Sequence, residues 1–334
     1  MYNETMSKSD RNHTIDILKG IAIILVLITH YEWTAGQRRF VLFPYLINMA
    51  IPIFMIITGY VYSASQERSC GSSIEKAYSL KRIFRRIVRY TLPFLVIVIW
   101  ELLDPKISLS YAPLDVMRWC IDGTVGKGSY YFPVMLQMIF LFPLVYFIID
   151  RKGPKGLWYC LIFNAIYEIL AWAYFIGDDT YRLISFRYIF LIASGVYAFK
   201  GYKLKLPVGF TMSIAGSSFI TILTYYGYET RIFHSAWAST SFLSSMLIIP
   251  LMIWVLQNVR ISFKPLEILG QASYHIFLVQ MVYYLGYYEL LGKKISSTAG
   301  HLALGCVICL GIGTAFYFAE KPLQNWIQGK IKKA

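Results

Sequence analysis

The hydrophobic pattern of the chain consists of long apolar runs separated by short polar loops. Membrane-spanning helices are predicted at 15–33, 43–63, 90–103, 130–149, 157–176, 183–199, 207–227, 239–257, 268–289 and 301–319. A helix needs about 20 mostly apolar residues to cross a bilayer, whereas the strands of a membrane barrel are short and alternating. The pattern therefore predicts an all-α polytopic membrane protein, a bundle of about ten transmembrane helices forming a single domain over residues 1–334.

Composition supports a membrane location. The 334 residues are 57% hydrophobic and 15% charged, and a soluble domain carries about 25% charge. The net charge of +14 comes largely from Lys and Arg in the loops on the side of the two termini, above all in residues 68–89. By the positive-inside rule both termini are cytoplasmic. The sequence predicts an integral protein, in a bacterial cytoplasmic membrane, whose partner is the lipid bilayer and not nucleic acid.

The first predicted span carries three ionisable residues, Asp16, Lys19 and His30. Lys19 and His30 are eleven residues apart, which places them about 20° apart around a helix, and Asp16 lies about 40° from His30. Ionisable residues inside membrane helices are costly and usually serve a function. Asp16, Lys19 and His30 therefore form one stripe along the helix, and this stripe is a candidate catalytic site. In the alternative, Asp16 and Lys19 pair at the membrane interface and His30 reaches outward to water.

Glu168 and Arg187 lie on neighbouring predicted spans, where they are expected to pair, either as a structural buried pair or as part of a substrate site. Of the five cysteines, Cys306 and Cys309 sit three apart in an apolar run with no His cluster nearby. That spacing favours helix packing, so no metal is predicted.

Six short motifs follow one another along the chain. They are Arg11 to Asp16, Lys19 and His30; Pro52, Phe54, Thr58-Gly59-Tyr60; Lys81-Arg82, Arg85-Arg86, Arg89-Tyr90; Tyr130-Tyr131-Phe132; Gly270, Ser273-Tyr274, Phe277-Leu278, Gln280; and Glu320, Pro322. In this order they resemble the membrane acyltransferase family 3, integral-membrane O-acyltransferases that modify cell-surface carbohydrates. Three positions depart from the family pattern: Lys19 stands for arginine, Tyr130 for tryptophan and Gln280 for histidine.

The resemblance implies an O-acyltransferase that moves an acyl group from cytosolic acyl-CoA, here acetyl-CoA, to a hydroxyl of a cell-surface or lipid-linked glycan. His30 would be the general base, Lys19 would hold or polarise the donor, and Asp16 would orient Lys19. The donor phosphates would bind a basic segment at the inner face, which consists of Lys81, Arg82, Arg85, Arg86 and Arg89. The alternative for this basic segment is a contact with anionic lipid headgroups.

The carbohydrate acceptor is expected to contact polar and aromatic residues from several spans, namely Tyr130, Tyr131, Glu168, Arg187, Tyr274 and Gln280. Two other functions remain open at this point. One is O-succinyl transfer from succinyl-CoA. The other is a non-catalytic transporter or export partner for a surface polysaccharide. The replacement of the family histidine by Gln280 is compatible with such a loss of catalysis.

Overall fold

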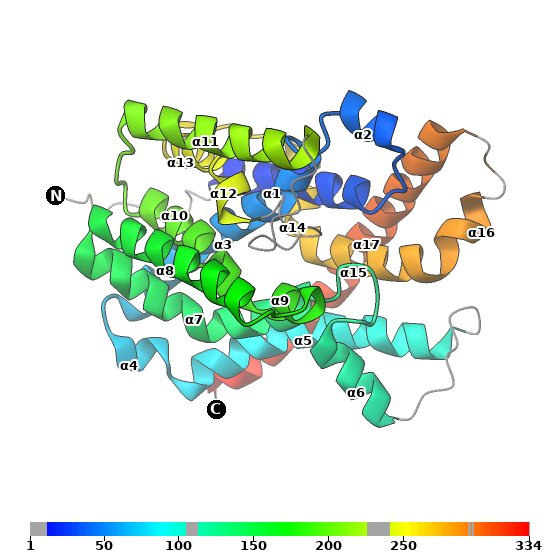
Figure 1. The fold of residues 1–334 in the computed structure, drawn as a ribbon. Coiled ribbons are helices and arrows are strands. Elements are labelled where there is room, and N and C mark those ends of the chain that lie inside the picture. The colour runs from blue at the N-terminus through cyan, green and yellow to red at the C-terminus, as the bar shows by residue number, and fades with distance from the viewer. Residues whose placement is uncertain (1–11, 105–112, 226–240, 293–294, 296, 334) are drawn as a thin grey trace.

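The computed structural model describes residues 12–104, 113–225, 241–292, 295 and 297–333, and its regular elements are all helical (Figure 1). The first half contains α1 (His13–Thr29), α2 (Ala35–Phe40), α3 (Ala50–Cys70), α4 (Ile74–Ala77), α5 (Leu80–Leu103), α6 (Pro113–Asp122), α7 (Tyr131–Lys152), α8 (Pro154–Ala173) and α9 (Asp178–Leu183). The second half contains α10 (Ile189–Phe199), α11 (Leu206–Tyr225), α12 (Phe242–Ser245), α13 (Ile249–Asn258), α14 (Lys264–Gln271), α15 (Ser273–Val282), the π-helical turn η4 (Tyr283–Tyr287), α16 (Tyr288–Gly292) and α17 (Thr298–Lys333).

Five of the described helices are long and apolar enough to cross a membrane. They cover Ile47–Cys70, Tyr131–Lys152, Pro154–Ala173, Leu206–Thr224 and Ala299–Ile331. They coincide with five of the predicted spans. The prediction of an all-helical chain is confirmed, and these long apolar helices support a polytopic membrane protein.

The other five predicted spans are present as shorter or interrupted helices among the described residues. Helix α1 has 17 residues, and α5 joins the 90–103 run to the basic segment in one continuous helix. The 183–199, 239–257 and 268–289 runs are each split. A proline in the first turn starts both α13 and α14, where a missing N–H is tolerated. Residues 226–227 and 239–240 of the predicted spans lie outside the described residues.

Helices α1 and α14 cross with their backbones in contact. A Cβ added to Gly20 would lie 2.4 Å from the carbonyl oxygen of Leu266, and one added to Gly270 would lie 1.8 Å from that of Asp16. Small residues allow such close approach between membrane helices, where dispersion contacts replace the hydrophobic driving force. The two glycines therefore fix α1, and the stripe that it carries, against α14.

A second close crossing joins α3 to α10. A Cβ on Gly59 would lie 2.1 Å from the carbonyl oxygen of Ile192, and one on Gly195 would lie 2.0 Å from that of Ile56. Gly59 belongs to the second sequence motif. Its place in that motif is explained by this contact, because any larger residue would separate the two helices.

The bundle has two distinguishable ends. Helices α2 and α16 lie at one end and α4 and the last turns of α17 at the other; we call these the α2 end and the α4 end (Figure 1). Between them, the buried apolar side chains of the described residues form two large clusters and a small one around Tyr167 and Tyr181. One large cluster contains residues of α3, α7, α10 and α13, and the other residues of α1, α5, α15 and α17.

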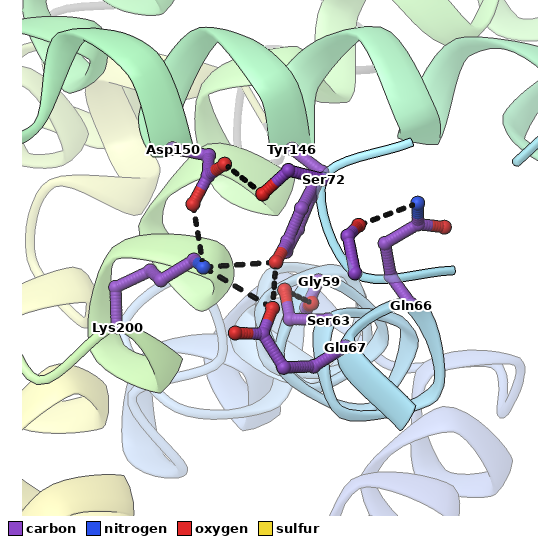
Figure 2. Close-up of polar contacts among 9 residues, drawn as sticks. Gly59, Ser63, Gln66, Glu67, Ser72, Tyr146, Asp150 and Lys200 are labelled. Carbon is purple, nitrogen blue, oxygen red and sulfur yellow. Dashed lines mark hydrogen bonds and ion pairs between the residues drawn. The ribbon is translucent and has the colours of Figure 1, made fainter. Parts of the chain in front are cut away.

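An ion-pair network joins three helices at the α4 end, around the ammonium of Lys200 (Figure 2). Its Nζ lies 2.7 Å from Asp150 Oδ1, 3.2 Å from Glu67 Oε2 and 2.8 Å from the Tyr146 hydroxyl. Burial alone would lower the pKa of Lys200, but hydrogen bonds with Asp150 and Tyr146 outweigh it and raise that pKa. The network ties the end of α10 to α3 and α7.

The α1–α14 crossing gives the first prediction. Gly270→Ala should lower the thermal unfolding midpoint in detergent, because its Cβ meets backbone that cannot rotate away; overpacking of this kind costs about 1–3 kcal/mol. Gly311→Ala in α17 is the matched control, since nothing lies within 4 Å of its Cβ position. An unchanged midpoint for Gly270→Ala would show that the two backbones are not in contact.

Candidate active site

A cavity of about 900 Å³ runs through the bundle, and Lys19 and His30 both line it. At a rise of 1.5 Å per residue, the two side chains are separated by about 16 Å along α1. Two of the three residues of the predicted stripe thus face one continuous space. Asp16 is 4% exposed and is not among the described residues that line the cavity. Its backbone instead contacts α14.

His30 ends α1 beneath a short strap, residues 126–129, that leads into α7. Gly128 in the strap has φ +92°, and a Cβ there would lie 3.4 Å from His30 Nε2 and 3.0 Å from the Phe277 ring. The Tyr284 ring lies 5.8 Å from the imidazole, and its hydroxyl donates to the carbonyl of Leu27 at 2.9 Å. Only glycine fits at position 128, for both conformational and steric reasons.

Gln280 holds this strap in place. Its side chain is fully buried, and its Nε2 donates to the carbonyl oxygen of Lys127 at 2.9 Å. The N–H of Gly126 also donates to Ser129 Oγ at 3.3 Å. Gln280 was predicted to contact substrate; the structure places its amide on the backbone of the strap, outside the described cavity lining.

Tyrosines form much of the polar wall of the cavity. Tyr130, Tyr131 and Tyr274, which were predicted as substrate contacts, all line it. Tyr62 and Tyr90 line it too; their hydroxyl oxygens are 2.6 Å apart, and Tyr274 donates to the Tyr90 carbonyl at 2.9 Å. Tyr62 was not among the predicted site residues, and Tyr90 stood only in the third motif with no role predicted for it, since tyrosine is frequent throughout this chain.

A histidine–carboxylate pair lies on another part of the wall. His275 Nε2 is 3.3 Å from Glu320 Oε2, and both side chains are buried and line the cavity. The His275 ring packs on Phe316, with centroids 4.9 Å apart. Glu320 belongs to the last sequence motif, and this contact links that motif to α15.

The basic segment approaches the cavity from the α4 end. Arg89 lines the cavity, and the Arg86 guanidinium lies 4.6 Å from the centre of the Tyr62 ring. Helix α17 packs along this segment, where Gln324 and Gln328 donate to the carbonyls of Arg89 and Arg85. The remaining members, Lys81, Arg82 and Arg85, precede Arg89 on α5 and are not among the described lining residues.

Glu168 and Arg187 are buried in a cluster of their own. The Tyr181 hydroxyl donates to Glu168, and the Arg187 guanidinium lies 4.5 Å from the centre of the same Tyr181 ring and 5.0 Å from that of Tyr188. Both predicted residues are therefore brought together through Tyr181. Neither is among the described residues that line the cavity.

The family comparison agrees with the arrangement of these motifs. Residues 12–320 match the model of the acyltransferase 3 family, described as an acyltransferase domain. The chain belongs to the acyltransferase 3 family. Searches of curated proteins and of solved structures return no significant match. The family resemblance predicted from the motifs is confirmed, and membership implies an acyl-group transferase acting between an acyl donor and an acceptor.

In this acyltransferase, all six of the sequence motifs meet at the cavity. In chain order they supply to its wall His30, Thr58, Arg89, Tyr131, Tyr274 and Glu320. Within the described part of the chain, no group of three or more His, Cys, Asp or Glu side chains is arranged to hold a metal ion.

Gln280 gives a prediction about the strap. Gln280→Met keeps the side-chain volume but leaves the Lys127 carbonyl without this donor, a loss of about 0.5–1.5 kcal/mol for one hydrogen bond. We expect faster cleavage by trypsin after Lys127. Gln257→Met is the control, because it loses bonds to the Ala198 and Tyr202 carbonyls elsewhere. Equal rates of cleavage in Gln280→Met and in this control would show that Gln280 does not hold the strap in place.

Proposed function

We propose that this acyltransferase transfers an acetyl group from acetyl-CoA to a hydroxyl of a cell-surface or lipid-linked glycan, with His30 as general base. The observation that carries the proposal is that His30 and Lys19 share one cavity, about 16 Å apart along α1. At this separation, the imidazole and the ammonium can each contact a different part of a large complex of bound donor and acceptor. Family membership favours acyl transfer over the alternative of an export partner.

The reaction follows from the roles of these two groups. Neutral His30 removes the proton from the acceptor hydroxyl as its oxygen attacks the thioester carbonyl carbon. The tetrahedral intermediate then collapses, the C–S bond breaks, and the leaving thiolate of CoA takes up the proton that His30 removed, which returns His30 to its neutral form. Lys19, about 16 Å from His30 along α1, is too far away to polarise the carbonyl that is attacked there, and it holds the pantetheine arm of the donor instead. Asp16, buried one turn before Lys19, balances its charge.

The donor enters from the α4 end in this proposal. Arg89 at the cavity wall, with Arg86 beside Tyr62 and Lys81, Arg82 and Arg85 along α5, gives the CoA phosphates a row of cations. Guanidinium groups bind phosphate through charge-assisted, bidentate hydrogen bonds. With ten spans and both termini cytoplasmic, the α4 end faces the cytosol of a bacterium, where acyl-CoA is available.

The acceptor enters from the α2 end, close to His30. Tyr130, Tyr131 and Tyr274 offer ring faces and hydroxyls to a sugar. Glu168 and Arg187 act from behind the wall through the Tyr181 cluster, and Gln280 acts through the strap. Three of the six predicted acceptor residues, Tyr130, Tyr131 and Tyr274, thus line the cavity and suit a carbohydrate. The other three, Glu168, Arg187 and Gln280, lie behind its wall.

The stripe on α1 gives the test of the proposed function. His30→Ala should lower acetyl transfer by about 10²–10⁴-fold, the usual worth of a general base, with detergent stability and donor binding kept. Lys19→Arg should be tolerated because it keeps the charge, whereas Lys19→Ala should not. The measurement is transfer of label from acetyl-CoA in proteoliposomes. A well-folded His30→Ala protein acylating at the parental rate would show that the stripe is structural.

The basic segment gives a separate prediction for the donor. Arg85→Ala combined with Arg86→Ala should raise the KM for acetyl-CoA at least about tenfold, since each charge-assisted contact contributes about 1.5–3 kcal/mol. Lys152→Ala is the control, an exposed cation at the same end of the bundle. If expression or membrane insertion falls while the donor KM holds, the segment binds anionic lipid headgroups instead.

A further inference from the structure

The cavity wall carries a strong excess of positive charge. Among the described lining residues, the basic ones are Lys19, Arg89, Lys127, Arg182 and Lys321, and the single acid is Glu320. Glu320 already contacts His275 at 3.3 Å. Three of the cations belong to the proposed donor side or to α1. Lys127 and Arg182 do not, and the proposed mechanism leaves both without a role.

Lys127 is held at the α2 end by its backbone. Gln280 binds its carbonyl, and the aliphatic chain carries the ammonium over two aromatic rings, 5.5 Å from the centre of Tyr284 and 5.8 Å from that of Tyr288. The residue is exposed, and among the described residues no acid forms an ion pair with it. An ammonium on tyrosine faces remains available to a stronger, anionic partner.

This ammonium lies beside the proposed base. The next residue, Gly128, packs on His30 Nε2, and the Tyr284 ring that carries the ammonium lies 5.8 Å from the imidazole ring. A hydroxyl within hydrogen-bond distance of His30 therefore lies against the strap. The groups that neighbour this hydroxyl on the same sugar come within reach of the four-carbon side chain of Lys127.

Arg182 supplies a second cation to the same wall. It lies at the end of α9, next to Leu183, whose side chain would be 3.0 Å from a Cβ on Gly123 just before the strap. Its Nη2 is 3.3 Å from Asp179, but Asp179 is 90% exposed, and such surface pairs are weak. The Nε atom of Arg182 is buried and has no hydrogen-bond partner among the described residues.

We propose that the acceptor is an anionic saccharide, with a carboxylate or phosphate group near the acylated hydroxyl that Lys127 and Arg182 bind together. The inference rests on the proposed function, because it takes His30 as the point where the hydroxyl lies. A neutral sugar would leave both cations unused, whereas a carboxylate or phosphate forms charge-assisted hydrogen bonds with them. The carboxylate would come from a uronic acid and the phosphate from a sugar phosphate.

Matched saccharides test the charge requirement without needing turnover. Binding to the purified protein is measured as the rise in its thermal unfolding midpoint in detergent at constant ionic strength. Two pairs of saccharides are compared. One pair is cellotetraose and its C6-oxidised form, tetraglucuronate, and the other is glucose and glucose 6-phosphate. One or both anionic members should raise the unfolding midpoint more than their neutral partners, and which pair responds identifies the carboxylate or the phosphate. Equal shifts within both pairs would overturn the proposal.

The two cations are then removed one at a time. Lys127→Gln and Arg182→Gln should each weaken binding of the anionic saccharide at least about tenfold, the equivalent of one charge-assisted contact, and leave CoA binding unchanged. Arg39→Gln is the matched control, an exposed cation on α2 at the same end that does not line the cavity. Equal losses in all three variants would indicate a general surface effect and contradict the proposal.

A donor comparison separates this site from a site for an anionic acyl group. If Lys127→Gln or Arg182→Gln changes the preference between succinyl-CoA and acetyl-CoA and spares saccharide binding, the cations bind the acyl group and the proposal is wrong. Failure of the proposed function has a different signature. In that case no saccharide accepts label from either donor, while the preference for the anionic saccharide in the binding measurement stands.

Discussion

The structure depends on the backbone contact between α1 and α14. Gly20 and Gly270 let the two helices approach until the positions of their missing Cβ atoms overlap neighbouring carbonyl groups. In a bilayer, apolar side chains gain little by moving from lipid to protein, so close van der Waals contact and polar bonds must hold the helices together. Because α1 cannot rotate within this contact, Lys19 and His30 keep facing the cavity, and Asp16 stays at the crossing.

The charged side chains around the cavity distinguish its two ends from each other. Burying ionisable groups in a membrane protein is costly, and here they gather around one space with cations in excess. Arg89 and Lys321 lie toward the end that carries the basic segment. Lys127 lies next to the residue that packs on His30, and Arg182 lines the same cavity. A large anionic donor and a second anionic ligand would therefore be drawn to opposite ends of one cavity, with the thioester and the acceptor hydroxyl meeting near His30.

Helical periodicity was enough to predict that Lys19 and His30 share one side of α1, since both line one cavity. It also placed Asp16 on that side, but Asp16 is buried and is not among the described lining residues. The motifs were enough to predict the family, and the close contacts explain why Gly59 and Gly270 are part of them. The strap was not predictable, because Lys127 and Gly128 lie in a loop where no periodic pattern marks a buried side. The break between α14 and α15 at Ala272 was not predictable either, nor was the contact of Gln280 with a backbone carbonyl. The apolar run that contains both residues gives no sign of these features.

The central claim is that one cavity joins a donor side at the α4 end to an acceptor side at the α2 end. Proteoliposomes sorted by the orientation of a C-terminal tag test it most directly, with tetraglucuronate inside and labelled acetyl-CoA outside. The account predicts that label reaches the enclosed saccharide only in vesicles whose α4 end faces outward. Equal labelling in both orientations, or consumption of the thioester in neither, would contradict it.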